Sequence, residues 1–118
     1  MLGLPSSVRI YLASEPEDMR KGIDSLAARV RRCGGDPFSG HLFVFVSRRR
    51  DRAKILAWDR GGYVLWYKRL EAGVFAWPML MQAGKTVEVD ASELAMLLDG
   101  VDFSRVKRGR RWEPRQVA

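Results

Sequence analysis

Apolar runs of the length of β-strands follow one another along the middle of the chain. Apolar and aromatic residues dominate positions 42–46, 55–58 and 63–70, and short polar turns separate these runs. The first turn, residues 48–52, holds four arginines, and the second contains the pair Gly61-Gly62. Runs of this length separated by such turns predict two successive hairpins, the first with a strongly cationic tip.

The segments before and after the hairpins each predict one more strand and one helix. Residues 8–12 and 86–89 alternate enough to form strands. Ser14 and Glu17 have capping-box spacing, which predicts a helix that ends at Gly34-Gly35. The apolar stripe of that helix recurs at spacings of three and four, in Met19, Ile23, Leu26, Ala27 and Val30.

A second helix is predicted near the end of the chain. Asp90 and Glu93 repeat the capping-box spacing, and Gly100 is placed to stop the helix. Its apolar stripe is formed by Leu94, Leu97 and Leu98. Together the elements predict an α+β domain in the order β-α-β-β-β-β-α, a small antiparallel sheet of about five strands with helices packed on one side.

Length and composition fit one globular domain. The chain has 118 residues, of which 47% are hydrophobic and 30% charged, so a single core is expected. We expect the domain to cover residues 1–103 and to be followed by a basic, partly ordered tail at residues 104–118. No apolar run approaches the roughly 18 residues of a membrane span. The lone Cys33 cannot form an internal disulfide, which favours a cytoplasmic protein with no membrane partner.

The net charge of +7 is concentrated in two places. Residues 48–54 carry five basic side chains and one acid, a local charge of +4. Residues 104–118 carry six basic side chains and one acid, a local charge of +5. Like charge gathered in this way repels itself unless a polyanion relieves it, so contact with nucleic acid competes with the simpler interpretation of two solvated basic faces.

Catalytic chemistry finds no support in the pattern of residues. The acidic residues are scattered, whereas metal-dependent strand transfer needs several converging carboxylates. His41 is the only histidine and Cys33 the only thiol, so the usual zinc ligand sets cannot be assembled. No phosphate-binding or dinucleotide glycine motif is present. The sequence therefore predicts a protein that is not an enzyme and has no metal or other cofactor.

Two smaller features have a functional and a structural interpretation. Tyr67 shares a strand face with Arg69 and could stack on a base, although the burial tendency of aromatic residues favours a core position. Arg20 and Lys21 stand at the predicted helix start, where they could meet phosphates. Because cations there oppose the helix dipole, we expect an internal ion pair instead, with Asp24 or Asp59.

Several segments resemble a known family. They are Met19-Arg20-Lys21-Gly22, the block Asp36-Pro37-Phe38-Ser39-Gly40-His41-Leu42-Phe43-Val44-Phe45, the pair Trp58-Asp59, the run Tyr67-Lys68-Arg69-Leu70-Glu71, and Leu97-Leu98-Asp99-Gly100. The chain resembles, over roughly residues 8–114, the accessory proteins encoded by the second open reading frame of a bacterial insertion-sequence family. These are sometimes called TnpB-type proteins and are unrelated to the RNA-guided nucleases that share the label.

The resemblance implies a non-catalytic protein that supports DNA transposition beside a co-encoded transposase. One hypothesis is that it binds DNA through the basic hairpin and the tail. The alternative is a protein adaptor that binds the transposase without direct DNA contact; homo-oligomer formation is left open. The candidate DNA-contacting residues are all basic: Arg48, Arg49, Arg50, Arg52, Lys54, Lys68, Arg69, Arg105, Lys107, Arg108, Arg110 and Arg111.

Overall fold

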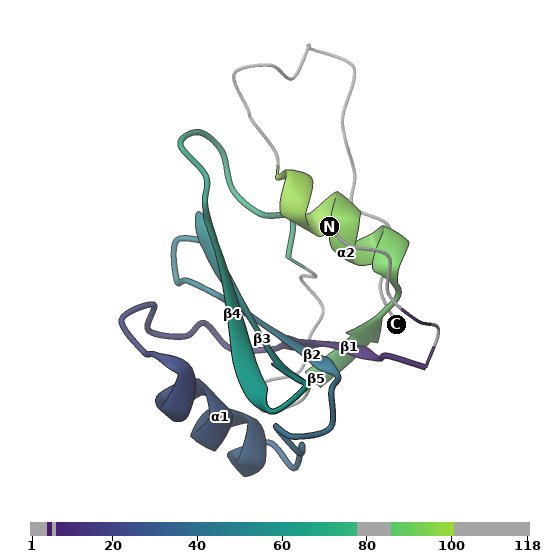
Figure 1. The fold of residues 1–118 in the computed structure, drawn as a ribbon. Helices are drawn as coiled ribbons and strands as arrows, with labels where there is room; N and C mark the ends of the chain where they lie inside the picture. Colours follow the sequence, from purple (N-terminus) through teal and green to yellow (C-terminus); the bar gives the residue numbers. More distant parts are fainter. Residues whose placement is uncertain (1–4, 6, 78–85, 101–118) are drawn as a thin grey trace.

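The computed structural model describes residue 5 and residues 7–77 and 86–100. Within these ranges the chain forms five strands and two helices in the predicted order, which confirms the α+β class (Figure 1). The elements are β1 (Ile10–Ala13), α1 (Ile23–Arg32), β2 (Leu42–Val46), β3 (Arg52–Asp59), β4 (Gly62–Arg69), β5 (Thr86–Val89) and α2 (Ala91–Asp99). The predicted domain boundary at residue 103 and the predicted tail lie outside the described residues.

The strands form one sheet in the order β4-β3-β2-β1-β5. All neighbours are antiparallel except β1 and β2, which run parallel with Ile10 opposite Leu42. The predicted antiparallel sheet is therefore confirmed for three of its four pairs, and the β1–β2 pair departs from it. The physical reason is the connection through α1, because a crossover helix returns the chain to the same end of the sheet before the next strand begins.

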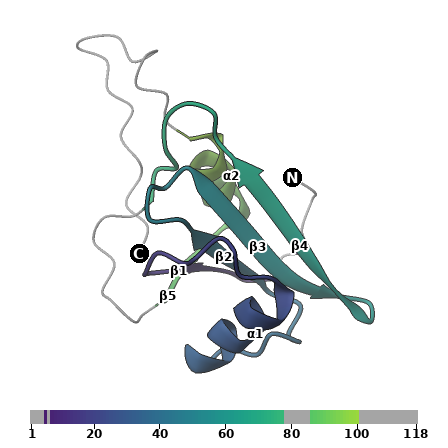
Figure 2. The same ribbon diagram turned by 90° about the vertical axis from the view of Figure 1, so that its left-hand side faces the viewer.

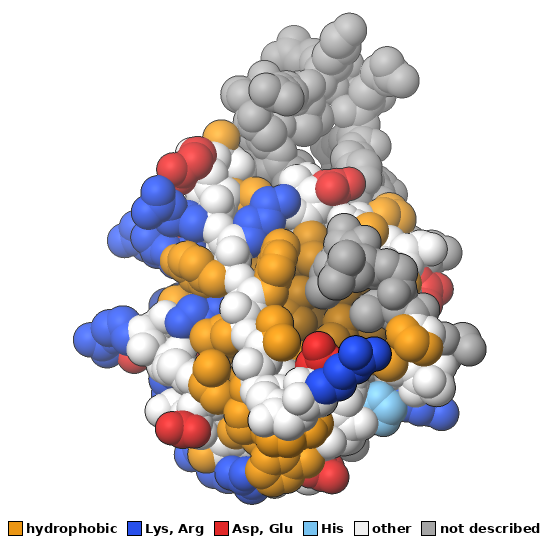
Figure 3. All heavy atoms as spheres, viewed as in Figure 1, with side chains coloured by type: hydrophobic (Ala, Val, Ile, Leu, Met, Phe, Trp, Pro, Cys, Tyr) orange, Lys and Arg blue, Asp and Glu red, His pale blue; other side chains and the backbone are white. Residues whose placement is uncertain are grey.

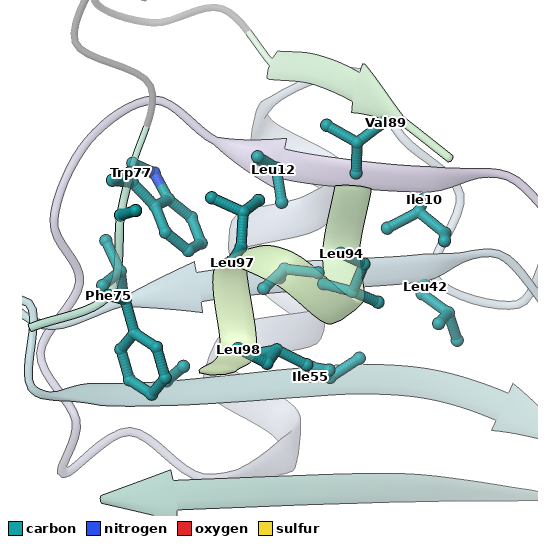
Figure 4. Close-up of a cluster of buried hydrophobic side chains, with 14 residues drawn as sticks. Ile10, Leu12, Leu42, Ile55, Phe75, Trp77, Val89, Leu94, Leu97 and Leu98 are labelled. Atoms are coloured by element: carbon teal, nitrogen blue, oxygen red, sulfur yellow. The ribbon is translucent and has the colours of Figure 1, made fainter. Parts of the chain in front are cut away.

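The helices cover opposite faces of the sheet, so the prediction that they pack on one side is wrong. From α1, Leu26 and Val30 pack with Phe43 and Phe45 on one face. On the other face α2 packs with residues of β1, β2 and β3, together with Phe75 and Trp77. Figures 1 and 2 show the two helices on the two sides of the sheet, and Figure 4 shows the α2 face with its buried side chains.

Strand β2 is the reason for this two-sided cover. All five of its residues, Leu42–Val46, are buried and apolar. Because successive side chains of a strand point to opposite faces, Phe43 and Phe45 face α1 while Leu42, Val44 and Val46 face α2. A strand that is apolar on both faces must be covered on both, and one layer of helices would leave half of it in water.

Helix α1 begins later than its capping-box pattern predicted. Gly22 is the N-cap and no side chain caps the helix, so the prediction of a start at Ser14 is wrong. The carboxylate of Glu17 is instead buried and paired with Lys21 and Arg29. Gly22 has an extended backbone that no helix interior could hold, so the preceding residues form an irregular segment.

The capping box of α2 is as predicted, and the second hairpin forms with its turn one residue earlier than the predicted pair Gly61-Gly62. The Asp90 side chain accepts a hydrogen bond from the Glu93 N–H at 2.8 Å, and the Glu93 side chain accepts one from the Asp90 N–H at 3.0 Å. Strands β3 and β4 are joined by Arg60 and Gly61, which have φ values of 45° and 86°. Two positive φ values in a two-residue turn match the twist of a tight hairpin.

The buried stripe of α1 can be tested with one charge. Leu26 is fully buried, so Leu26→Asp should lower the free energy of unfolding by roughly 3 kcal/mol or more, because it buries an unpaired carboxylate. Ser25→Asp is the matched control, since Ser25 is exposed in the first turn of the helix, where an acidic side chain is tolerated. Urea denaturation followed by circular dichroism measures both. Wild-type stability of Leu26→Asp would contradict the packing described above.

Candidate nucleic-acid interface

A shallow groove of about 470 Å³ lies between the irregular segment before α1, the turn that joins β2 to β3, and β4. We call the turn, residues 48–51, the arginine turn. Tyr67 lines the groove from β4. The basic side chains that line it are Arg20, Arg48, Arg49 and Arg52. The groove thus joins the sequence-predicted cationic tip to a segment about thirty residues earlier in the chain.

Backbone hydrogen bonds fasten the arginine turn to the rest of the fold. The buried Ser47 accepts the Arg50 N–H at its carbonyl and the Arg52 N–H at its hydroxyl, at 2.9 and 3.1 Å. The Ser47 hydroxyl also donates to the Asp51 carboxylate at 3.2 Å. Two carbonyls of the turn, those of Arg50 and Asp51, accept the N–H groups of Phe75 and Leu70, each at 2.7 Å. The backbone of the turn is therefore fixed by hydrogen bonds with Ser47, Leu70 and Phe75. Within the turn Arg50 has a φ of 62°.

Arg48 and Arg49 project from this fixed turn. Both residues are exposed, and neither side chain makes a hydrogen bond or ion pair within the part of the chain that the structure describes. Arg52 lies 3.8 Å from Asp51, which is the outer limit of an ion pair. Figure 3 shows basic side chains gathered at the upper left, over the end of the sheet where β3 begins and β4 ends.

Three of the predicted DNA-contacting residues have partners inside the fold. The ammonium group of Lys54 donates to the carbonyls of Met19 and Lys21, at 2.7 and 2.9 Å. Lys68 donates to the carbonyl of Leu98 at 2.7 Å, at the C-terminal end of α2. Arg69 forms two hydrogen bonds with the Glu71 carboxylate, at 2.9 and 3.1 Å.

The contacts of Lys54 and Lys68 join distant parts of the fold, and the sequence did not predict them. Each gives backbone carbonyls an ammonium donor, and the Lys68 contact stabilises the negative end of the α2 dipole. The predicted contacts in the tail, at Arg105, Lys107, Arg108, Arg110 and Arg111, lie outside the described residues. Arg48, Arg49 and Arg52 are the predicted residues that the structure brings together at the groove.

The acidic side chains at the groove are paired with neighbouring cations. Arg20 contacts both Asp18 carboxylate oxygens, at 2.8 to 3.1 Å, and these hydrogen bonds lower the pKa of Asp18 from 3.8 to about 2. Glu17 is paired with Lys21 and with Arg29. The expectation that Arg20 and Lys21 form internal ion pairs is confirmed, but their partners are Asp18 and Glu17 rather than Asp24 or Asp59.

Tyr67 is the aromatic residue of the groove. Its side chain is 49% exposed, so the expectation of a core position is wrong. The ring lies 5.4 Å from the Lys54 ammonium group, a cation–π distance. Phe75 and Trp77, by contrast, are buried. Tyr67 escapes burial because it lies on an edge strand beyond the reach of α1.

A second pocket, on the α1 face of the sheet, contains the histidine and the cysteine of the chain. This apolar pocket of about 330 Å³ includes Tyr11, Cys33 and His41. His41 accepts a hydrogen bond from the Arg9 N–H at 3.0 Å and packs against Tyr11, which gives it a structural role. Among the described residues no group of three or more His, Cys, Asp or Glu side chains could hold a metal ion. None of the helices in these ranges has the length and apolar character to cross a bilayer.

Comparison with known proteins gives one family match and two relatives. A family model described as IS66 Orf2 like protein matches residues 8–108. The uncharacterized protein y4jC of Sinorhizobium fredii (strain NBRC 101917 / NGR234) is 35% identical over 119 residues, covering 100% of both chains. The uncharacterized protein y4hO of the same strain is 35% identical over 118 residues, covering 99% of both. No solved structure matches the chain significantly.

The pairing of Asp18 with Arg20 makes a prediction about pH. Because the pKa of Asp18 in the folded protein lies below its ordinary value, the contact stabilises the folded state above about pH 4 and is lost as the pH falls toward 2. Carboxyl-carbon NMR should show a midpoint near 2 for Asp18. In Arg20→Met the midpoint should rise toward 3.8 but stay below it, because the guanidinium contacts are lost while the backbone N–H of residue 20 still donates to the Asp18 carboxylate. An unchanged midpoint in Arg20→Met would assign the shift to another cause.

Proposed function

The chain belongs to the IS66 Orf2-like family, accessory proteins of transposition in IS66 insertion sequences, and from that premise we propose that it binds the DNA backbone through the arginine-turn groove. The family match agrees with the sequence resemblance described above. In this role the protein contributes no catalytic group, and it assists a separate transposase by holding DNA.

The observation that carries the proposal is the position of Arg48 and Arg49. Two exposed guanidinium groups, which have no hydrogen-bond or ion-pair partner among the described residues, project from a turn whose backbone is fixed by Ser47, Leu70 and Phe75. Guanidinium groups bind phosphate oxygens in bidentate fashion, and a rigid turn loses little conformational freedom on binding. The acids nearby compete weakly, because Asp18 and Glu17 already have cationic partners.

The arrangement favours contact with phosphates over recognition of bases. The two described helices lie on opposite faces of the sheet and do not form a helix-turn-helix pair. The groove is shallow and its basic groups come from an irregular segment, the arginine turn and the start of β3, so neither described helix is presented to a major groove. Binding of this kind positions a protein on DNA with little dependence on sequence.

The proposal predicts the salt dependence of DNA binding. Each phosphate contact contributes about 0.9 to the slope of log affinity against log salt, so removing two contacts should reduce the slope by about 2. We therefore expect this reduction in the double variant Arg48→Ala/Arg49→Ala, with a similar loss of affinity for any duplex sequence. Fluorescence anisotropy with a labelled duplex, repeated over a range of salt concentrations, measures it.

A matched control removes the same charge elsewhere. Arg31 and Arg32 are exposed in the last turn of α1, at the far end of that helix from the segment that lines the groove. Arg31→Ala/Arg32→Ala should keep the wild-type slope. Equal slopes in all three proteins would remove the arginine turn from the DNA surface. If the turn variant instead lost association with the co-encoded transposase while DNA binding stayed weak throughout, the adaptor hypothesis would replace this proposal.

A further inference from the structure

Strand β4 is an open edge of the sheet. It is eight residues long and pairs with β3 on one side, and no described residue pairs with its other side. Figure 2 shows β4 along the outer margin of the sheet, with neither helix beyond it. An exposed strand of this length presents unpaired N–H and C=O groups, which are a template for another strand.

The hairpin register identifies which backbone groups are unpaired. Asp59 and Gly62 flank the two-residue turn, so they form a hydrogen-bonded pair, and such pairs recur at every second residue. The even-numbered residues of β4 therefore bond to β3. The hydrogen bond from the Leu70 N–H to the Asp51 carbonyl continues the same phase. The backbone groups of Tyr63, Leu65, Tyr67 and Arg69 consequently point away from the sheet.

This edge lacks the usual protection against pairing. Natural edge strands carry proline, a bulge or a central charge, but residues 63–67 are Tyr-Val-Leu-Trp-Tyr and pair with β3 without a bulge. Val64 and Tyr67 are 51% and 49% exposed, and they are two of the four exposed large apolar residues in the described chain. An edge that is both apolar and uncovered needs a partner to remove this surface from water.

We propose that the partner is a second copy of the chain, joined by antiparallel pairing of the two β4 strands about a two-fold axis at Leu65. Residues opposite each other in an antiparallel pair share a face. In this register Tyr63 lies across from Tyr67 of the second copy, and Val64 lies across from Trp66. Leu65 faces its own equivalent, where the outward N–H and C=O groups exchange two hydrogen bonds.

The distribution of charge along β4 favours pairing with a second copy in this register. The strand is apolar in its middle and cationic at one end only, at Lys68 and Arg69. Pairing about Leu65 places Lys68 opposite Gly62 of the second copy, so the lysines are kept apart. A shift of the axis to Tyr67 would bring Leu65 opposite Arg69 and leave Tyr63 unpaired. The strand is thus complementary to itself in one arrangement, which is what a closed two-fold dimer requires.

The dimer would carry both grooves on the same side. A two-fold axis perpendicular to the sheet keeps the α1 faces of the two copies together, and the two Tyr67 residues would be four positions apart along the strands, about 13 Å. The association itself does not depend on DNA binding by either groove, because it rests on the β4 edge alone.

Analytical ultracentrifugation of the full chain without DNA tests the proposal. We expect the wild type to have a sedimentation mass twice the 13.5 kDa of one chain. Val64→Lys should sediment as a monomer, because it places two like charges diagonally across the axis while altering only an exposed side chain. Met96→Lys is the control, since Met96 is an exposed apolar residue of α2 and not of β4, and it should remain dimeric.

A cross-link tests the register. In a Cys33→Ser background, Leu65→Cys should form an intermolecular disulfide on mild oxidation, because opposed Cα atoms at the axis are about 5.5 Å apart. Val64→Cys in the same background should not, since its equivalent is diagonal to it. A wild type that stays monomeric between about 1 and 100 μM, the range of a modest interface, would overturn the proposal. A dimer that is unaffected by Val64→Lys would overturn it as well.

Discussion

The two-sided burial of β2 is the constraint on which the rest of the structure depends. Its five apolar residues require cover on both faces, and the chain meets this need with α1 on one side and α2 on the other. The crossover through α1 also sets β1 parallel to β2. β5 then pairs with β1 and is followed at once by α2, so the last helix lies over the face that α1 leaves open.

The same packing divides the basic residues into two groups. Lys54 and Lys68 lie on strands beside the covered faces, where their ammonium groups reach carbonyls of the segment before α1 and of the end of α2. They act as internal braces. Arg48 and Arg49 belong to a turn that is held by its backbone hydrogen bonds, and their side chains are exposed. Charge alone does not separate these roles, since each of the four residues carries one positive charge.

The β4 edge of the sheet carries backbone groups and apolar side chains that the core does not bury. Because β4 lies at the margin, its outward backbone groups and the side chains of Val64 and Tyr67 have no cover among the described residues. The groove and the open edge share Tyr67, so association of two copies and binding of DNA would occur on adjoining surfaces. A basic site on each copy, repeated by a two-fold axis, would contact a longer stretch of duplex than one copy alone and raise affinity by multivalency.

The sequence by itself determined the features that are local. The order of elements, the capping box at Asp90, the hairpin at Gly61 and the arginine turn were all predictable, because each depends on residues adjacent in the chain. The alternation along β4 also predicted correctly that Tyr67 shares a face with Arg69. The continuous apolar run of β2 was the available signal for cover on both faces.

The tertiary structure alone decided the features that join distant segments. The parallel β1–β2 pair, the opposite placement of the helices and the partners of Lys54 and Lys68 depend on contacts across thirty or more residues. The late start of α1 has the same origin, since Glu17 meets Arg29 and the Glu17 N–H bonds to Val46 only after folding. A side chain bonds to whatever the packed core brings within reach, and no pattern along the chain specifies that neighbour.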